Sequence, residues 1–418
     1  MRILVLGINY APERSGVAPF TTGLCEHLAT QGHQVIVVTT FPYYPEWKVW
    51  DGFGGSLHTK SLVNGVTLHR VWQFVPSRPS KFVQRMFYHL SFTVNAFLCA
   101  LFTERCDIIY CSSPPAELGM AAYILAKLKK VPFVIKITDL ASDAALATGI
   151  VREGIVIRIA RALEKFIHRK AALTICLCQG FIDRLHERGV PAERLLLIPD
   201  WGDTENIFPG ERVDGFRSEH GLGAEEFLVL HTGNMGKKQG LMNLIQAAEL
   251  SKGEQNLVWL IVGQGEERSA LEATIRKQEL TNIRLLPFQP KEDLAKMYSA
   301  ADVLIVNQKA AVRDAVIPSK LLTYMAAGRS VVAAVAEKSE AARYVTRSQC
   351  GVVVPPEDPG ALTAAVLRLC RDRELRSSLG RNGRKYAEDH FTKEKVMYQY
   401  DQFFEVIGES CPRGNSIT

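Results

Sequence analysis

The sequence predicts an α/β protein of two doubly wound domains, each with parallel strands and covering helices, followed by C-terminal helices. Three observations support this fold class. At 418 residues the chain exceeds the size at which one hydrophobic core keeps growing. Short apolar, β-branched runs, typical of strands buried on both faces, alternate with helical segments. A Pro-, Gly- and Asp-rich stretch, Arg194 to Phe208, separates two such series and is the best linker candidate.

The first series opens as a β-α-β unit. Arg2 to Asn9 is a predicted strand, Ala11 to Gly16 a loop, Val17 to Gln31 a helix and Gln34 to Thr40 a second strand. The loop contains Gly16 but lacks the G-x-G-x-x-G spacing, so a nicotinamide site is not expected there. Further strand candidates in this series are 65–72, 108–111, 133–138 and 174–178.

Ligands of such sheets gather where the strands end. The loops 11–16, 112–117 and 139–149 are expected at that edge of the first sheet. Asp139 and Asp143 lie in the last of them. Either carboxylate could accept a proton or steady a positively charged reaction centre, and loop capping is the alternative role for both.

The second series repeats the alternation. Its predicted strands are 227–233, 257–263, 283–288, 302–307, 330–335 and 351–356, with helices from 240, 266, 291 and 319, and then at 360–371, 374–389 and 392–407. We therefore expect an N-terminal domain at 1–198 and a C-terminal domain at 199–390. The segment 391–418 is expected to contain a helix that returns to the N-terminal domain, and a tail.

The net charge of +6 is unevenly placed. Residues 1–198 hold 22 Lys and Arg against 14 Asp and Glu, whereas the rest of the chain is close to neutral. The first half is therefore expected to face an anionic surface or substrate. The nine cysteines are scattered, which favours buried thiols over a metal site or a disulfide framework.

Two segments of the first half have membrane-surface character. Met86 to Phe102 contains no Asp, Glu, Lys or Arg and has basic flanks, so it could be a helix lying in the membrane interface or a helix of the core. Arg152 to Lys170 places six Arg and Lys among apolar residues at helical spacing. Such a face suits an anionic surface, although solvated helices carry it too.

The helix predicted between Pro318 and Gly328 could bind an anion at its start. Ser319 supplies a hydroxyl and Lys320 an ammonium beside the free N–H groups of the first turn, a combination that suits a phosphate or diphosphate. An ordinary capped helix is the alternative. Turns at 233–240, 263–265, 287–290 and 314–320 follow strands and should share one edge, so their amides and lysines could converge on one polyphosphate.

These residues carry a resemblance to a known family. The stretches GHQVIVVTT, PDWGDTENIF, GNMGKKQGL, LIVGQGEER, YSAADVLIV and PSKLLTYMAAGRSVVA, followed by GVVVPPED, resemble the retaining GT-B glycosyltransferases of family four over nearly the whole chain. Within that family the chain is most similar to bacterial exopolysaccharide transferases of the colanic-acid type. The resemblance implies two facing Rossmann-like domains. It also implies metal-independent sugar transfer from a nucleotide diphosphate sugar, with retention and without a cofactor.

Three departures from the family pattern bear on the site. The paired glutamates of the family would fall on Ala315 and Thr323, and its Arg and Lys at the phosphate turn would fall on Asn234 and Gln239. A family histidine would fall near Asp139. We therefore expect four cations to neutralise the leaving diphosphate: Lys237, Lys238, Arg313 and Lys320.

The expected catalytic residues are Asp139, Asp143, Lys238 and Lys320. The expected substrate-binding residues are Gly16, Gly233, Asn234, Lys237, Gln239, Gly263, Gly265, Phe288, Arg313, Asp314, Ser319 and Thr323. Phe288 belongs to the turn expected to contact the base, and no metal ligand is assigned. His231 and His33 are assigned structural roles.

The predicted function is sugar transfer to a lipid-linked saccharide during exopolysaccharide assembly. The enzyme is expected in the cytoplasm, peripherally on the inner face of the cell membrane through its first domain, with no nucleic-acid partner. Two alternatives stay open. A sugar-nucleotide epimerase would use the same phosphate turns without a membrane face, and a non-catalytic assembly partner would explain Ala315 and Thr323.

Overall fold

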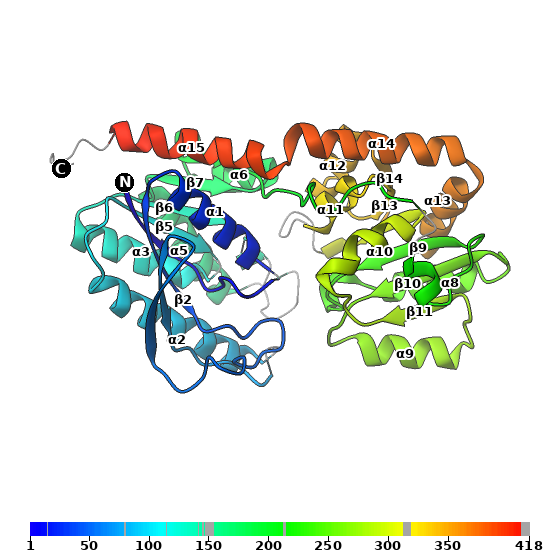
Figure 1. The fold of residues 1–418 in the computed structure, drawn as a ribbon, viewed down its shortest axis with the longest axis horizontal. Coiled ribbons are helices and arrows are strands. Elements are labelled where there is room, and N and C mark those ends of the chain that lie inside the picture. Colours follow the sequence, from blue (N-terminus) through cyan, green and yellow to red (C-terminus); the bar gives the residue numbers. More distant parts are fainter. Residues whose placement is uncertain are drawn as a thin grey trace. The chain divides into compact units, whose positions relative to one another are not determined.

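The computed structural model describes residues 1–14, 16–78, 81–113, 115–140, 142–143, 146, 154–211, 215–311 and 319–410. The chain divides into two compact units. The first consists of Met1–Pro199 together with the chain from Met397 onward, and the second of Asp200–Val396. Figure 1 traces the elements of each unit, which are described separately below.

The first unit is built on an eight-stranded sheet in the order β3-β4-β2-β1-β5-β6-β7-β8. All neighbouring strands are parallel except β3 and β4, which form an antiparallel hairpin. The strands are β1 (Arg2–Leu6), β2 (Gln34–Thr40), β3 (His58–Val63), β4 (Val66–Val71), β5 (Ile108–Ser113), β6 (Phe133–Ile137), β7 (Leu173–Cys176) and β8 (Leu195–Leu197).

Helices cover both faces of this sheet because successive strand residues point to opposite sides. In β6 the Ile135 side chain faces α3 and α5, where it lies close to Gly119. The next residue, Lys136, lies over the rings of Phe20 in α1 and Tyr400 in α15. The helices are α1 (Ala18–Thr30), α2 (Phe82–Leu101), α3 (Ala116–Lys129), α5 (Ile155–Lys170), α6 (Gln179–Glu187), the 3-10 turn η1 (Ala192–Arg194) and α15 (Lys393–Ser410).

Helix α15 is held to the first unit by contacts from its middle. Asp401 accepts a hydrogen bond from His27 Nε2 at 2.8 Å, and the Tyr400 ring packs against Tyr110 of β5 with centroids 6.5 Å apart. These contacts place the end of the chain on the same unit as its beginning.

The segment from Met86 to Phe102 lies in α2, and the core alternative is confirmed for one face of this helix. One face of α2, with Tyr88, Phe92 and Ala96, is buried in the unit. The opposite face exposes large apolar side chains to solvent. Among the described helices, none is long and apolar enough to cross a membrane.

The second unit is built on a six-stranded parallel sheet in the order β11-β10-β9-β12-β13-β14. Its strands are β9 (Phe227–Thr232), β10 (Leu257–Val262), β11 (Ile283–Leu286), β12 (Val303–Asn307), β13 (Ser330–Ala334) and β14 (Gly351–Val354). The helices and 3-10 turns are α7 (Gly215–Glu219), η2 (Lys237–Gln239), α8 (Met242–Leu250), α9 (Arg268–Lys277), η3 (Lys291–Asp293), α10 (Leu294–Ala300), α11 (Lys320–Ala326), α12 (Glu340–Ser348), α13 (Pro359–Arg371) and α14 (Arg373–His390).

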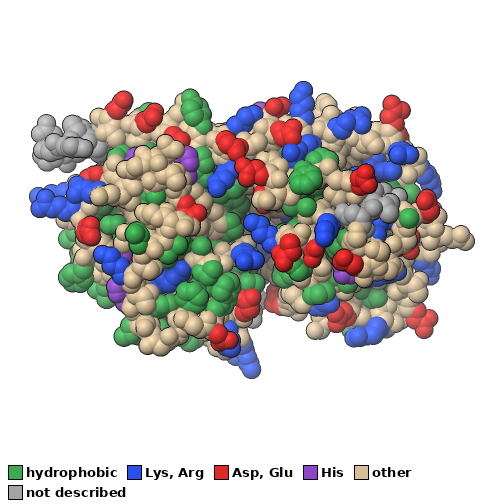
Figure 2. Space-filling model, in the orientation of Figure 1, with side chains coloured by type: hydrophobic (Ala, Val, Ile, Leu, Met, Phe, Trp, Pro, Cys, Tyr) green, Lys and Arg blue, Asp and Glu red, His purple; other side chains and the backbone are tan. Residues whose placement is uncertain are grey.

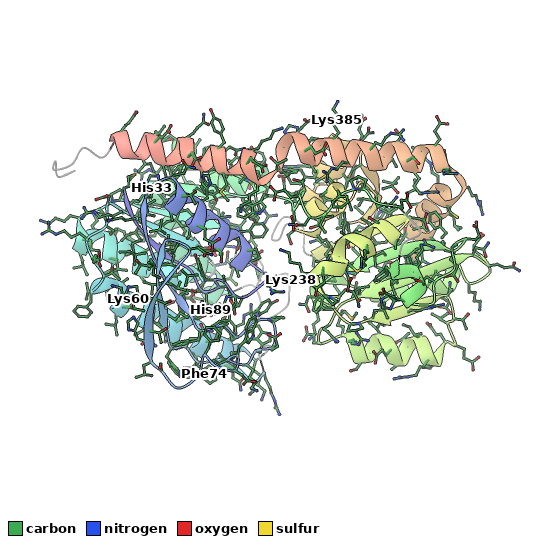
Figure 3. The ribbon with its side chains drawn as sticks, viewed as in Figure 1. His33, Lys60, Phe74, His89, Lys238 and Lys385 are labelled. Atoms are coloured by element: carbon green, nitrogen blue, oxygen red, sulfur yellow. The ribbon has the colours of Figure 1, made fainter. Side chains whose placement is uncertain are left out.

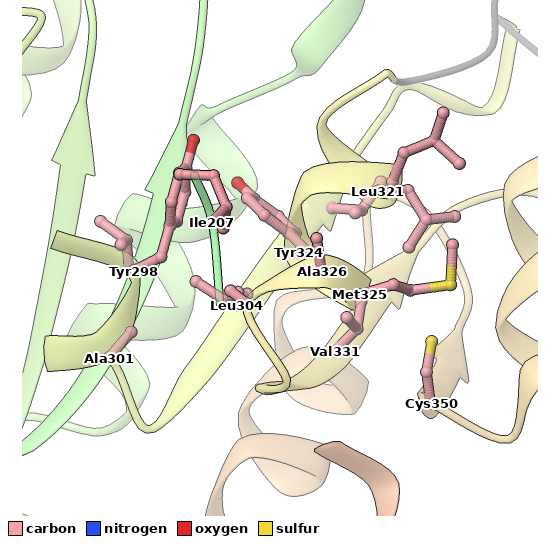
Figure 4. Packing of buried hydrophobic residues seen from close by; sticks show 14 of the residues in the cluster. Ile207, Tyr298, Ala301, Leu304, Leu321, Tyr324, Met325, Ala326, Val331 and Cys350 are labelled. Atoms are coloured by element: carbon pink, nitrogen blue, oxygen red, sulfur yellow. The ribbon is translucent and has the colours of Figure 1, made fainter. Parts of the chain in front are cut away.

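Each face of this sheet has its own hydrophobic core. In β9, Leu228 and Leu230 belong to the core that includes Tyr324 and Met325 of α11 (Figure 4), whereas Val229 belongs to the opposite core. This alternation explains why the strands are continuous apolar runs in the sequence. The structure thus confirms the predicted α/β class, with two doubly wound, Rossmann-like units and C-terminal helices.

Candidate active site

The candidate site of the second unit lies at the carboxyl ends of β9 and its neighbours. Successive strands run outward from β9 in both directions, with β10 on one side and β12 on the other. The strand order therefore reverses at β9, and ligands of open parallel sheets bind where the order reverses. The residues that follow β9, from Gly233 onward, occupy this position.

Lys320 is the central cation of this edge. It is the first residue of α11, and its Nζ lies 3.0 Å from Gln239 Oε1 and 3.4 Å from His231 Nε2. The same ammonium lies 3.1 Å from the position that a Cβ on Gly233 would occupy. The structure therefore brings Lys320, predicted on the turn 314–320, together with Gly233 and Gln239 of the predicted turn 233–240.

His231 fixes the direction of the Lys320 donors. Its Nδ1 lies 2.9 Å from the Ile305 carbonyl, which can only accept, so Nδ1 carries the proton and Nε2 presents a lone pair to Lys320. Burial, with a further contribution from the Lys320 charge, holds the pKa of His231 well below its usual range. His231 therefore stays neutral and accepts from Lys320, a contact that the sequence did not reveal.

Lys320 has three N–H donors, and its two neighbours accept two of them. No acceptor among the described residues takes the third, which can bind a ligand at the glycine-lined edge. Burial lowers the pKa of Lys320 to about 7. The amine is therefore only partly protonated near neutral pH, and a bound anion favours its protonated form. Its residue keeps partial solvent access, which leaves a route for that anion.

The glycines of two turns allow those turns to touch. A Cβ on Gly263 would lie 1.9 Å from the Gly233 carbonyl oxygen, and a Cβ on Gly265 would lie 2.5 Å from the Met235 carbonyl oxygen. Hydrogen bonds join the turns, from Gly233 N to Val262 O at 2.9 Å and from Met235 N to Gln264 O at 2.7 Å. Only glycine fits at such approaches, so the predicted pair of glycine turns forms one continuous edge.

Asn307 anchors the same turn from β12, a contact that the sequence did not reveal. Its buried side-chain amide donates to the Gly240 carbonyl at 3.1 Å, and its oxygen accepts from Asn243 Nδ2 at 2.8 Å. From the other side, the backbone N–H of Thr232 donates to the Tyr324 hydroxyl at 3.0 Å. These hydrogen bonds fix the end of β9 and the turn that follows it next to Lys320.

The other predicted residues of this unit differ in their surroundings. Lys237 and Lys238 lie in η2, the first exposed and the second half-buried, and neither is ion-paired within the described chain. Figure 3 shows Lys238 at the margin of the second unit. Asn234, Phe288 and Ser319 are exposed, and Thr323 is half-buried in α11. Arg313 and Asp314 lie outside the described residues, as does Ala315.

The two candidate aspartates of the first unit have different surroundings. Asp143 is buried and ion-paired with Arg161, Arg184 and Arg188, at 3.5, 2.9 and 2.5 Å. Its oxygens are engaged by three guanidinium groups, which favours an anchoring role over proton transfer. Asp139, just after β6, is half-buried and is the more accessible of the two candidates.

A second group at the carboxyl edge of the first sheet was not foreseen. Glu13 is buried, and its Oε1 accepts the backbone N–H groups of Tyr43 and Tyr44 at 2.9 and 2.8 Å. Burial raises the pKa of Glu13. The carboxyl thus joins the loop after β1, which contains Gly16 with φ +64°, to the loop after β2.

Aromatic rings gather on that second loop. Tyr43, Tyr44, Trp47 and Tyr88 have ring centroids between 5.5 and 6.4 Å apart. Trp47 is half-buried and has a φ of +54°, a conformation that bulky residues rarely adopt. Strained residues of this kind cluster at ligand sites, which makes this aromatic cluster a candidate binding surface.

Comparisons with known proteins agree with this two-part arrangement. The family described as "Glycosyl transferase 4-like domain" matches residues 15–201, and "Glycosyl transferases group 1" matches residues 213–386. The chain is 32% identical to the putative colanic acid biosynthesis glycosyl transferase WcaI of Escherichia coli, over 96% of this chain and 98% of that protein.

Solved structures show a similar fold at low sequence identity. A sucrose-phosphate synthase from Thermosynechococcus elongatus superposes with a TM-score of 0.75 at 20% identity, covering 98% of this chain and 99% of that one. Alr3699/HepE of Anabaena, solved in complex with UDP, superposes with a TM-score of 0.73 at 16% identity, covering 97% of this chain and all of that one.

Proposed function

Since the chain belongs to the group 1 glycosyltransferases and adopts their GT-B fold, we propose that it transfers a sugar from a nucleotide diphosphate sugar to a lipid-linked saccharide, with retention of configuration. That it is a glycosyltransferase follows from its family. The donor type, the acceptor and the stereochemistry are the proposal.

One observation carries the donor assignment. Lys320 is hydrogen-bonded to Gln239 and His231 and lies beside Gly233, whose backbone packs directly against Gly263. A cation with a preset direction beside closely packed backbone is suited to a diphosphate. Alr3699/HepE, solved in complex with UDP and with UDP-glucose, supports a nucleotide diphosphate in the same kind of fold.

Sugar transfer requires charge stabilisation at two places. Cleavage of the anomeric bond leaves negative charge on the diphosphate, which Lys320 and Lys238 neutralise, helped by Lys237. Donors fixed before the reaction lower its barrier because they need no reorganisation. Asp139 accepts the proton of the acceptor hydroxyl or steadies the positive charge on the sugar.

The aromatic cluster of the first unit supports an acceptor that contains sugar rings. Tyr44 and Trp47 offer partly exposed ring faces, and Tyr43 and Tyr88 pack behind them. Apolar ring faces bind the C–H faces of sugars, and Glu13 holds their loop in place. We assign this surface to the saccharide part of the acceptor.

The lipid part of the acceptor is assigned to the exposed face of α2 and its neighbours. Val83, Phe87, Leu90, Val94 and Leu98 recur along one face of α2, each about half-exposed. Helix α3 packs against α2, and α5 packs against α3. These two helices expose further apolar side chains: Ile124, Leu128, Ile155, Val156 and Ile159. In Figure 2 hydrophobic side chains gather over the part of the first unit that contains α2.

Cations flank this apolar face. Lys81 and Arg85 at the start of α2 are exposed, as are Arg158 and Lys170 of α5. An apolar face with cationic margins suits an anionic membrane surface, on which the protein would lie without crossing it. We therefore place the enzyme at the cytoplasmic face of the cell membrane, in exopolysaccharide biosynthesis like the similar WcaI.

A thermal-shift screen of nucleotide diphosphates and their sugars tests the donor assignment. The correct donor should raise the melting temperature, and Lys320→Ala should weaken its binding about tenfold or more. Lys385→Ala is the matched control, because Lys385 is an exposed lysine of α14 (Figure 3). Equal weakening by both variants, or by neither, would refute the role of Lys320.

The acceptor assignment needs a separate assay. Release of nucleotide from the donor that binds should require a lipid-linked saccharide, and the product should keep the anomeric configuration of the donor. Nucleotide release without any acceptor would point to the epimerase alternative instead.

A further inference from the structure

Three metal-ligating side chains meet where the edge hairpin of the first sheet contacts α2. His58 lies in β3, His69 in β4 and Cys99 in the last turns of α2. Their ligand atoms all lie within 4.8 Å of one another. Among the described residues, this is the one such group of three or more His, Cys, Asp or Glu side chains.

The hairpin register explains how the two imidazoles meet. His58 is opposite Val71 and His69 is opposite Lys60, so the two histidines are diagonal neighbours on one face of the hairpin. Their rings are nearly parallel, with an interplanar angle of 24° and centroids 5.2 Å apart. The third side chain, Cys99, reaches the pair from α2.

The two imidazoles meet directly through their ring nitrogens. His58 Nε2 lies 3.0 Å from His69 Nδ1. Without a metal, one neutral imidazole donates its N–H to the lone pair of the other, and a bound metal ion would take the place of that proton. A metal ion satisfies both nitrogens and adds the sulfur as a third ligand.

We propose that His58, His69 and Cys99 bind a divalent transition metal of the zinc class. Zinc takes imidazole nitrogens at about 2.0 to 2.1 Å and thiolate sulfur at about 2.3 Å. The three ligand atoms, now within 4.8 Å of one another, would have to rotate towards one centre to reach those distances. Binding releases the thiol proton of Cys99, and a water molecule fills the fourth position.

The surroundings admit an ion. His58 is exposed, and His69 and Cys99 are half-buried, so solvent reaches the group directly. The nearby ammonium of Lys60, labelled in Figure 3, is 3.8 Å from the Glu104 carboxylate, which offsets its charge. The metal ties the edge hairpin to α2, so its role is to stabilise the first unit.

This inference does not rest on the proposed function, because it uses none of the residues of the donor edge or the aromatic cluster, although Cys99 follows Leu98 of the α2 face assigned to the lipid. The sequence favoured buried thiols and no metal site, because the two histidines come from a hairpin that it did not reveal. Most of the described cysteines are indeed buried, but Cys99 is among the half-buried ones.

Titration of the metal-free, full-length protein with Co²⁺ tests the site. We expect a sulfur-to-cobalt charge-transfer band, displaced by Zn²⁺, and a Zn²⁺-dependent rise in melting temperature of at least ~2 °C. His58→Ala and Cys99→Ser should each abolish the band and the rise. His58 is exposed on an edge strand, so its variant is expected to fold.

Cys370→Ser is the matched control, because Cys370 is a half-buried cysteine of α13 in the second unit. It should leave the cobalt spectrum and the melting temperature shift unchanged. Cobalt binding without the charge-transfer band, or an unchanged spectrum in both His58→Ala and Cys99→Ser, would overturn the proposal.

Discussion

Lys320 Nζ lies 3.4 Å from Nε2 of His231, a residue 89 positions earlier in the chain whose other ring nitrogen is bound to a β12 carbonyl. The pair links the start of α11 to the middle of the sheet. Because His231 is buried and neutral, it directs the lysine without competing for the ligand's negative charge.

Replacing His231 by phenylalanine should therefore weaken nucleotide binding while Lys320 is still present. The ring keeps much of its volume, but Lys320 loses one acceptor and the Ile305 carbonyl loses its donor. We expect the Kd of the donor nucleotide to rise about tenfold, from the loss of roughly one hydrogen bond to a charged group. Isothermal titration calorimetry measures this, and an unchanged Kd would separate His231 from the site.

Nucleotide binding should also depend on pH through Lys320. Its pKa is about 7 in the free protein, and a bound diphosphate raises it by favouring the ammonium. The Kd should be constant below pH 7 and rise with pH above it, until the pKa of the complex is reached. Calorimetry between pH 6 and pH 9 checks this, with Lys320→Ala as the control for titration of the nucleotide itself.

Lys320, which is half-buried, should also lower the free energy of unfolding when no ligand is bound. Its folded pKa of about 7 lies below its unfolded value of about 10.4, so the unfolded chain binds more protons between those pH values. Stability attributable to Lys320 therefore rises with pH across that window. Lys320→Met should melt at a higher temperature than the parent at pH 6, and the difference should shrink towards pH 10. A variant that melts lower at pH 6 would contradict this.

The close approach of the glycine turns gives a test of packing. Gly263→Ala places a methyl group 1.9 Å from the Gly233 carbonyl oxygen, which is backbone and must shift. We expect a loss of about 1–3 kcal/mol in the free energy of unfolding and weaker nucleotide binding. Gly253→Ala is the matched control, because a Cβ there meets no atom within 4 Å. Denaturant unfolding of both variants gives the comparison.

The sequence predicted the architecture because the strands are buried on both faces and so are continuous apolar runs. It missed β3, since HTKSLV is mostly exposed on an edge strand and lacks that signal. Lys320 and the glycine turns could be predicted from the sequence because each belongs to a recognisable turn that follows a strand. The roles of His231 and Asn307 depend on which turns the folded sheet brings together. A local sequence pattern does not contain that information.

The apolar face of α2 predicts binding to anionic lipid vesicles. Phe87 and Leu90 are each about half-exposed on that face, at 55% and 48%. Replacing both by serine removes apolar area that would enter the interface and leaves the cationic margin of Lys81 and Arg85 in place, so vesicle binding should fall several-fold.

Leu250→Ser is the matched control, because Leu250 is 61% exposed at the end of α8 in the second unit. Vesicle flotation measures the bound fraction, and high salt should weaken the remaining electrostatic part. Equal flotation of the double variant and the parent protein would show that this face does not meet the membrane.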